Sequence, residues 1–591
     1  MDLLEKGEAS EKGMGKSFHS GLKLTANAQQ LLSARYFLKD AQGKVLENPQ
    51  QLFKRVAKNV AGAEARQNGE WEDKFYRVMA NLLFLPNSPT LMNAGLPNGQ
   101  LSACFVLPVE DSLVSIFTTL KDTAMIHQSG GGTGYNFSKL RPHGDRIASS
   151  GGVSSGPMAF IKIYDTATEH VRQGGKRRGA NMGILNANHP DIEEFILAKS
   201  EGTKLQNFNL SVGITDDFME AVQVNGSWPL INPRTKTIAK TIKAKNIWNL
   251  IVSQTWKTGD PGLIFLNTIN KHNPIPKRKI QSTNPCGEVP LFEYESCNLG
   301  SLNLSKMLIS ENDVWKVDWD LLEETIEVAI RFLDNVISVN HYLLPKVETE
   351  TKRNRKIGLG VMGWAEMLAL LNIPYASDEA IELGERLMQF IKSKSYQTSQ
   401  HLAEERGVFP SWTESIHYPD RLMRNATCNS IAPTGSISVI ANTSYSIEPL
   451  YALAYKRVGI LENQTQLEIN PVFVYKMKML GLWNDELKDE VLRTGTIQQL
   501  EIIPKEVKRV FETSLQIPWK YHLKHQRAFQ KYTDNAVSKT VNLREDTDEE
   551  TISEIYRTAW EYGLKGITIY RDGSKANQVL QACHLNRSSN C

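Results

Sequence analysis

The chain has 591 residues, of which 41% are hydrophobic and 23% are charged, and 68 basic against 65 acidic residues leave a net charge of +3. These values exclude a disordered, collagen-like or coiled-coil chain, and the balanced charge argues against a surface that coats nucleic acid. No apolar run approaches the roughly 20 residues that span a bilayer, and the polar N-terminus lacks the apolar core of a signal peptide. We therefore expect an intracellular, cytoplasmic protein without membrane contact, built as several domains or as one large barrel with additions.

In chain order, residues 1–85 are expected to form a mostly helical N-terminal region. From 86 to 575, Gly- and Ser-rich turns alternate with apolar stretches and helical patterns, which favours an α/β fold. Within that span, residues 456–530 are charged and mixed, which indicates a helical insertion, and residues 576–591 are expected to form a flexible tail. The helices that periodicity predicts cover Asn27–Phe37, Ile116–His127, Asp191–Lys199, Leu321–Val339 and Asp378–Arg406.

One glycine pattern imitates a nucleotide-binding motif. Gly358-Leu-Gly360-Val-Met-Gly363 matches GxGxxG, but a dinucleotide fold needs an apolar strand immediately before the glycines. The preceding residues are Lys352-Arg-Asn-Arg-Lys356, which we do not expect in a buried strand. The pattern therefore predicts a tight turn before a helix at Trp364–Leu371.

The loop around Cys286 carries the first chemical signal. Pro285 and Gly287 flank the cysteine, so the backbone must turn there. In an extended loop, residues two apart point the same way, so Asn284, Cys286 and Glu288 could present amide, thiol and carboxylate to one site. A neighbouring carboxylate disfavours a thiolate, which suits a thiol that acts in its neutral, hydrogen-transferring form. The alternative is a buried cysteine in a structural turn.

The other cysteines divide into three groups. Cys104 and Cys297 lie in apolar stretches that resemble strands, and their spacing does not establish a pairing. Cys428 is expected in the core, while Cys583 and Cys591 lie in the tail. No Cys-x-x-Cys pair occurs, so we expect no metal site.

A hydroxyl-rich turn follows an apolar strand end at residues 430–438. Backbone N–H groups and hydroxyls at such a turn favour an anion, and a phosphate or diphosphate fits because no lysine of an NTPase loop is present. A plain helix N-cap is the alternative.

These segments together resemble the large subunit of ribonucleotide reductases, and most closely the adenosylcobalamin-dependent class II enzymes. The resemblance extends from Asn87 to Lys575 and implies a ten-stranded α/β barrel, of the fold shared with glycyl-radical enzymes, with a thiyl cysteine on an internal finger loop. It also implies reduction of ribonucleotides, specifically diphosphates, to deoxyribonucleotides. The motifs that carry it are Asn87–Gly95, Ser102–Phe105, Gly130–Gly134, Gly174–Arg178, Asn284–Glu288, Cys297–Leu304, Ile357–Gly363, Ala432–Ser436 and Gly563–Gly573.

The resemblance implies a role for each matching residue. Cys286 corresponds to the thiyl radical that removes the ribose 3′-hydrogen, Glu288 to the base on the 3′-hydroxyl, and Asn284 to an amide that hydrogen-bonds the sugar. Cys104 and Cys297 correspond to the dithiol that reduces C2′ and becomes a disulfide. Further substrate contacts are expected at Ser88, Ala103, Gly132, Pro285, Gly287, Pro433, Thr434, Gly435, Ser436 and Ile437.

The resemblance also implies regulation and partners. Deoxynucleoside triphosphates that set substrate specificity are expected at Asp111, Ser112 and Arg141, and the segment that links this site to base choice at Lys176, Arg177, Arg178, Gly179 and Ala180. A homodimer is expected, and thioredoxin or a similar protein should reduce the enzyme, with Cys583 and Cys591 as candidate relay thiols. The first 60 residues do not resemble the ATP-cone regulatory domain.

The class assignment rests on sequence differences. A class I large subunit needs two adjacent tyrosines near the end of the barrel, whereas this chain has Ile569-Tyr570 there and no Tyr-Tyr pair. No glycyl-radical motif is visible either, so adenosylcobalamin is the expected radical source. The alternatives are a class I subunit with unusual radical entry and a non-catalytic nucleotide-binding homologue.

Overall fold

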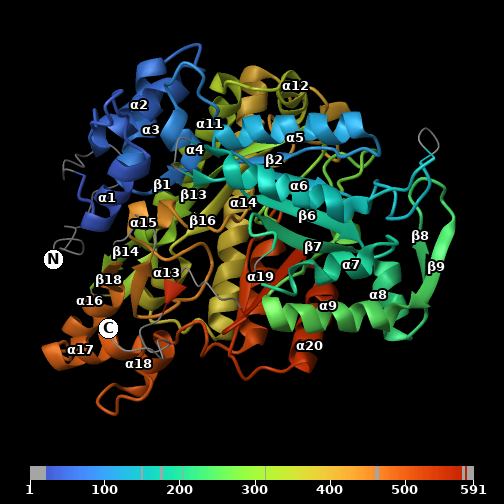
Figure 1. Ribbon diagram of the computed structural model, residues 1–591. Coiled ribbons are helices and arrows are strands. Elements are labelled where there is room, and N and C mark those ends of the chain that lie inside the picture. Colours follow the sequence, from blue (N-terminus) through green and yellow to red (C-terminus); the bar gives the residue numbers. More distant parts are fainter. Residues whose placement is uncertain are drawn as a thin grey trace.

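The computed structural model describes residues 22–147, 151–173, 177–202, 204–312, 314–458, 465–574 and 580–581. Its N-terminal part is a group of helices, α1 (Ala26–Arg35), α2 (Pro49–Ala61) and α3 (Asn68–Ala80). Helix α2 begins where it does because Asn48 and Gln51 form a reciprocal capping box. Figure 1 shows these helices together at one side of the molecule, and α2 and α3 contact the long barrel helix α11 (Trp319–Val339).

Ten strands form the central sheet. One half consists of parallel neighbours in the order β2, β3, β6, β7 and β10. Helices connect these strands, as parallel pairing requires. The strands are β2 (Cys104–Val106), β3 (Gly132–Asn136), β6 (Asn181–Asn186), β7 (Phe208–Ile214) and β10 (Gly262–Phe265). The connecting helices are α5 (Leu113–Gln128), α6 (Gly156–His170), α7 (Ile192–Ile196), α8 (Asp216–Gln223) and α9 (Ala244–Thr258), and α10 (Leu266–Lys271) follows β10.

The other half of the sheet runs in the opposite direction. Strand β13 (Ser296–Asn303) pairs in parallel with β16 (Ile357–Met362), and β19 (Thr540–Leu543) pairs in parallel with β20 (Gly566–Arg571). Antiparallel contacts of β13 with β2 and of β20 with β10 join the two halves. Parallel bridges from Leu359 to Asn429 and from Ile431 to Val537 continue the pairing from β16 toward β19, so the sheet closes on itself as a barrel.

The remaining elements cover the barrel or project from it. Strand β1 (Phe84–Pro86) lies antiparallel to β13, and a hairpin of β8 (Ser227–Ile231) and β9 (Ile238–Lys243) projects at one end (Figure 1). Further small pairs are β4 (Arg172–Gln173) with β5 (Arg177–Arg178) and β14 (Leu308–Glu311) with β15 (Val314–Val317). The other barrel helices are α4 (Ser88–Asn93), α12 (Pro345–Asn354), α13 (Trp364–Leu370), α14 (Asp378–Arg406), α15 (Ile437–Ala441), α19 (Trp519–Gln530) and α20 (Glu549–Glu561).

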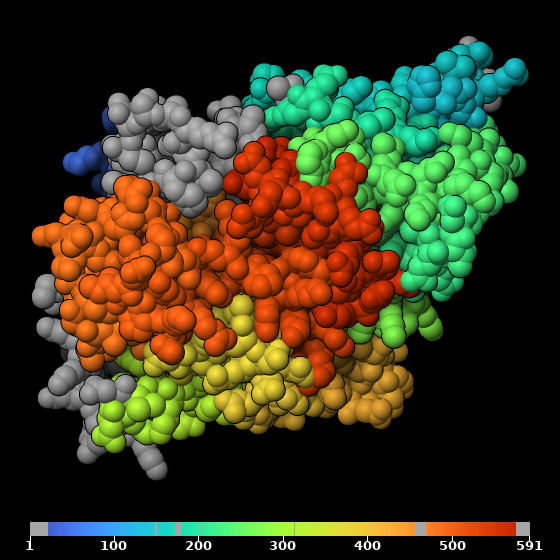
Figure 2. Space-filling view, turned by 90° about the horizontal axis from the view of Figure 1, so that it is seen from below, coloured from blue at the N-terminus to red at the C-terminus, as the bar shows by residue number. Residues whose placement is uncertain are grey.

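The five helices predicted from periodicity are confirmed, with Asp378–Arg406 as one helix, α14. The prediction of a helical insertion at 456–530 is wrong at the start of this segment. The segment begins with strands β17 (Ala454–Val458) and β18 (Thr465–Ile469), and three helices follow. Those helices pack around their own apolar cluster and share one face of the molecule with the C-terminal part of the barrel (Figure 2). They are α16 (Pro471–Met479), α17 (Asp485–Thr494) and α18 (Lys505–Val510).

The predicted turn over Gly358–Gly363 is wrong in most of its length. Ile357–Met362 is the buried strand β16, and only Gly363, with φ of 80°, turns the chain into α13. Glycine is needed in the strand because a Cβ on Gly360 would lie 2.3 Å from the carbonyl oxygen of Ser430. The pattern is therefore a packing signature of the barrel, since neighbouring backbones approach closely there.

Candidate active site

The Cys286 loop is the tip of a hairpin inside the barrel. Strands β11 (Ser282–Thr283) and β12 (Pro290–Leu291) pair in antiparallel register, and the Gly287 N–H donates to the Asn284 carbonyl at 3.1 Å. The tip is thus a tight turn, and the expectation of an extended loop is wrong. Asn284 and Glu288 are buried on its two sides, whereas Cys286 is exposed at its apex.

Strands β3 and β7 fix one side of this finger. A Cβ on Gly134 would lie only 1.8 Å from the Thr283 carbonyl oxygen, so the finger backbone rests directly on β3. The Asn136 side-chain amide donates to the Gln281 carbonyl at 2.8 Å, and that of Asn209 donates to the Pro285 carbonyl at 2.8 Å. Neither asparagine was predicted as a site residue, although for Asn209 an amide within the largely apolar strand β7 was an available signal.

The other half of the barrel fixes the opposite side of the finger. The Glu288 carbonyl accepts hydrogen bonds from the Ser430 hydroxyl at 2.8 Å and from the Ala536 N–H at 2.9 Å. Ser430 is the first residue of the segment predicted to hold phosphate. The finger and that turn therefore share a backbone anchor.

Cys104 and Cys297 lie directly opposite each other on the antiparallel strands β2 and β13. Facing residues in such a pair have Cβ atoms about 4.5–5.5 Å apart, a spacing from which a disulfide can form with small adjustment. Both residues are free thiols here. The Asn284 side-chain amide donates to the Cys104 sulfur at 3.1 Å, which brings the finger against the pair.

The environment keeps both thiols protonated. Burial raises the pKa of Cys104 well above its usual value, and the charges of Glu288, Cys297 and Cys286 raise it further. Burial also raises the pKa of Cys297. Neutral S–H groups can donate hydrogen atoms or protons, whereas a nucleophilic cysteine needs the thiolate.

The phosphate turn lies beside this cluster. Ala432 packs against the apolar group that contains Cys104 and Cys297. Thr434, with φ of 58°, braces the turn, because its hydroxyl lies 2.8 Å from that of Ser438 and accepts from the Ser446 N–H at 2.8 Å. The Ser436 side chain makes no capping bond to α15, which disfavours the plain N-cap.

The other predicted substrate residues lie on neighbouring elements. The Ala103 N–H donates to the Cys297 carbonyl at 3.1 Å, and the Ala103 carbonyl accepts from the Gly132 N–H at 2.8 Å. A Cβ on Gly132 would lie 2.9 Å from the Pro285 ring, which explains a glycine where β3 meets the tip of the finger. Ser88 begins α4, and its hydroxyl lies 2.8 Å from that of Tyr36.

The predicted effector residues meet at the start of α5. The Arg141 side chain donates to both carboxylate oxygens of Asp111, at 3.1 and 2.9 Å, and Ser112 caps the helix. Ala180, at the end of the predicted linking segment, accepts at its carbonyl from the Thr133 N–H on β3 at 3.1 Å. Arg177 and Arg178 form strand β5 and Gly179 follows them, buried, whereas Lys176, Cys583 and Cys591 lie outside the described residues.

Two classes of feature are absent from the described part of the chain. No group of three or more histidine, cysteine, aspartate or glutamate side chains there could hold a metal ion. Among the same residues, no helix is long and apolar enough to cross a membrane.

Comparisons with known proteins identify relatives over most of the chain. Residues 22–99 match the ribonucleotide reductase all-alpha domain, and residues 102–422 and 420–570 match the ribonucleotide reductase barrel domain. A vitamin B12-dependent ribonucleoside-diphosphate reductase of Thermoplasma acidophilum is 49% identical over 95% of this chain and 80% of its own length. One from Mycobacterium tuberculosis is 47% identical over 95% and 81%. The solved class Id ribonucleotide reductase alpha subunit of Actinobacillus ureae aligns with a TM-score of 0.77 at 26% identity, over 93% of this chain and 97% of that one.

Proposed function

The chain belongs to the ribonucleotide reductase large-chain family, and we propose on that basis that it reduces ribonucleoside diphosphates to 2′-deoxyribonucleoside diphosphates with adenosylcobalamin as radical source. The observation that carries the proposal is the facing thiol pair Cys104 and Cys297 with the Cys286 finger laid against it. This arrangement supplies the two electrons that the reduction consumes.

The finger residues initiate the reaction. Cys286, as a thiyl radical, takes the 3′-hydrogen of the ribose, and Glu288 accepts the proton of the 3′-hydroxyl. Asn284, whose amide already bonds Cys104, orients the sugar between finger and dithiol. The turn from Pro433 to Ile437 holds the diphosphate with backbone N–H groups and hydroxyls.

The thiol pair completes the reaction. The 2′-hydroxyl leaves as water with a proton from one thiol, and the pair delivers two electrons and the second hydrogen to C2′. Cys104 and Cys297 end as a disulfide, and Cys286 returns the 3′-hydrogen. The raised pKa values of both buried thiols favour this reaction, because each must begin as S–H.

The finger tip fits a radical source that approaches from outside the chain. Cys286 is exposed, and a Cβ on Gly287 would meet no atom within 4 Å, so the apex of the finger is open beside Gly287. Cys286 and Gly287 are the residues that would face adenosylcobalamin. When bound, this cofactor supplies the initiating radical through its weak cobalt–carbon bond.

Two further regions, the start of α5 and the exposed faces of α5 and α6, support proposals about regulation and assembly. Deoxynucleoside triphosphates bind at Asp111 and Arg141. The linking segment ends at Ala180, whose carbonyl contacts Thr133, the residue after Gly132 on β3. The exposed apolar side chains on α5 and α6 favour a homodimer through these helices. They are Leu113, Val114, Phe117 and Ile163.

The disulfide must be reduced after each turnover. We assign that step to thioredoxin or a similar cytoplasmic dithiol protein, with Cys583 and Cys591 as relay. A reducing compartment suits this chemistry, because Cys104 and Cys297 must return to thiols.

Experiments can distinguish this function from two alternatives. A class I subunit would need a second, radical-generating chain, and a non-catalytic homologue would bind nucleotides without turnover. Ile569-Tyr570 in place of two tyrosines on β20 disfavours the first, and the complete set of thiols disfavours the second.

The test is anaerobic turnover of the purified single chain with adenosylcobalamin and a small dithiol. Deoxynucleotide should form without a partner chain, and Cys286→Ser should abolish it while substrate still binds, because the serine O–H bond is too strong to give the radical. Cys428→Ala, which removes a buried thiol elsewhere in the barrel, should retain turnover. Deoxynucleotide formation by Cys286→Ser would contradict the assignment.

A further inference from the structure

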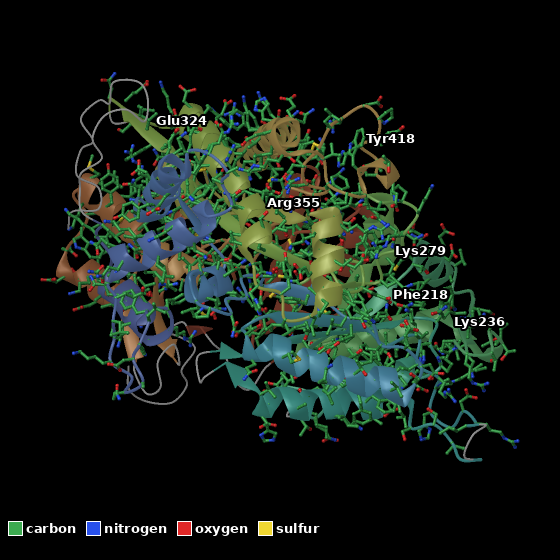
Figure 3. All side chains as sticks on the ribbon, turned by 90° about the horizontal axis from the view of Figure 1, so that it is seen from above. Phe218, Lys236, Lys279, Glu324, Arg355 and Tyr418 are labelled. Carbon is green, nitrogen blue, oxygen red and sulfur yellow. The ribbon has the colours of Figure 1, made fainter. Side chains whose placement is uncertain are left out.

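A buried ion pair lies immediately behind Cys297. The Lys356 ammonium contacts the Glu295 carboxylate at 2.7 Å, and the two side chains are 2% and 1% exposed. Glu295 stands two residues before Cys297 in the chain, and the Cys297 sulfur lies 3.4 Å from the Asn298 carbonyl oxygen and 3.6 Å from the Lys356 carbonyl oxygen. This burial is not predictable from the sequence, because Lys356 belongs to a run of basic residues. Its neighbour Arg355 is also buried and is labelled near the middle of the view in Figure 3, whereas the exposed Lys236, between β8 and β9, is labelled near the edge.

Neighbouring groups hold this pair in one geometry. The Phe292 N–H donates to the Glu295 carboxylate at 2.7 Å, and the Asn354 side-chain amide donates to its other oxygen. The Lys356 ammonium also lies 4.1 Å from the centre of the Phe292 ring. A buried pair of this kind adds little stability over well-packed apolar side chains, because desolvation offsets the attraction. Because stability does not explain the ion pair, its position next to a thiol indicates a chemical role.

The pair makes the two thiols unequal. At Cys297, the charge of Lys356 favours a thiolate more strongly than Glu295 or Glu288 opposes it. At Cys104, the charges of Glu288, Cys297 and Cys286 oppose a thiolate, and the hydrogen bond from the Asn284 amide favours one. Of the two sulfurs, Cys297 is the one beside a cation, because Lys356 immediately precedes Ile357, which lies opposite Asn298 in the parallel β13–β16 pair.

We propose that Lys356, held by Glu295, is a positioning residue that makes Cys297 the leaving thiolate when an external dithiol reduces the Cys104–Cys297 disulfide. The inference rests on the proposed function of this pair. The incoming thiolate bonds to the Cys104 sulfur, and the electron pair of the broken S–S bond goes to the Cys297 sulfur beside Lys356. The second thiol of the reductant then displaces Cys104, so the reductant becomes a disulfide and its two protons restore both cysteines.

The energetic reason is general to thiol–disulfide exchange. The sulfur whose thiolate is better stabilised leaves faster, so attack is directed to its partner. Loss of the lysine charge should slow expulsion of Cys297 by about tenfold and weaken the preference for attack at Cys104.

The experiment uses the full chain with Cys583→Ser and Cys591→Ser, so that the tail contributes no thiol, and without cofactor. Diamide forms the disulfide, excess 2-mercaptoethanol reduces it, and acid-quenched samples are mapped by peptide mass spectrometry. The first mixed disulfide should be on Cys104, with Cys297 free. Lys356→Gln should reduce about tenfold more slowly and show adducts on both cysteines, while Lys356→Arg should restore rate and position. Lys539→Met, which removes an equally buried lysine paired with Glu448, should change neither.

The outcomes separate the inference from the function beneath it. Failure of diamide to link Cys104 with Cys297 would overturn both the thiol pair and this inference. A disulfide that forms but takes its first adduct on Cys297, or that Lys356→Gln releases at the wild-type rate, would overturn the inference alone. Where Lys356→Gln does not fold, as circular dichroism would reveal, the adduct position in the parent chain decides.

Discussion

Gly134→Ala tests whether the placement of the finger on β3 controls turnover. A Cβ at this position would lie 1.8 Å from the Thr283 carbonyl oxygen, and Cβ atoms essentially never approach backbone closer than 3.0 Å. The obstacle is backbone rather than a flexible side chain, so the finger must move away from β3 by about 1.2 Å to reach that limit. Cys286 lies three residues beyond Thr283 and moves with it.

A displacement of about 1 Å at a reacting group can cost about 10²-fold in rate. We therefore expect Gly134→Ala to lower kcat by about two orders of magnitude while the protein stays folded. Gly132→Ala should have a smaller effect, because its Cβ would meet the Pro285 side chain at 2.9 Å, and a ring can shift more easily than a strand. Gly69→Ala, in α3 with nothing within 4 Å, is the matched control and should keep wild-type activity.

The assay measures kcat and KM with adenosylcobalamin and a small dithiol, together with thermal unfolding and the alkylation rate of Cys286. The alkylation rate should change in Gly134→Ala, because the thiol has moved, and remain unchanged in Gly69→Ala. A folded Gly134→Ala enzyme with wild-type kcat and wild-type alkylation would refute the claim that β3 positions the finger.

Three further predictions concern other parts of the chain. Glu64, which joins the N-terminal helices to Arg331, has a pKa lowered to about 2, so its contribution to stability is complete above pH 4.5 and is lost as the pH falls toward 2. Glu64→Gln should lower the free energy of unfolding at pH 7 by about 3–5 kcal/mol. Denaturant titration measures this value, and an unchanged value would contradict the prediction. Arg141→Ala should weaken deoxynucleoside triphosphate binding in calorimetry and flatten its effect on base choice, whereas unaltered effector affinity would place the site elsewhere. Changing Cys583 and Cys591 to Ser should stop turnover driven by thioredoxin and largely spare turnover driven by dithiothreitol; full thioredoxin-driven activity would exclude the tail as relay.

The sequence by itself determined the features that depend on local chemistry. The helix periods of Leu321–Val339 and Asp378–Arg406 predicted α11 and α14, because an amphipathic stripe is a property of one segment. A reaction at a thiol could be predicted from Asn284, Cys286 and Glu288, because the three residues lie within five positions of one another.

The tertiary structure decided what depends on segments far apart in the chain. It placed Cys104 opposite Cys297, since strand register is set by the packing of the whole barrel rather than by spacing. It also buried Lys356, which lies in a run of basic residues that would be expected on the surface, because Glu295, just before the neighbouring strand β13, neutralises the charge. The partner of Lys356 is 61 positions away in the chain, so local composition cannot predict the ion pair. Only the closed barrel places both charges next to the thiol.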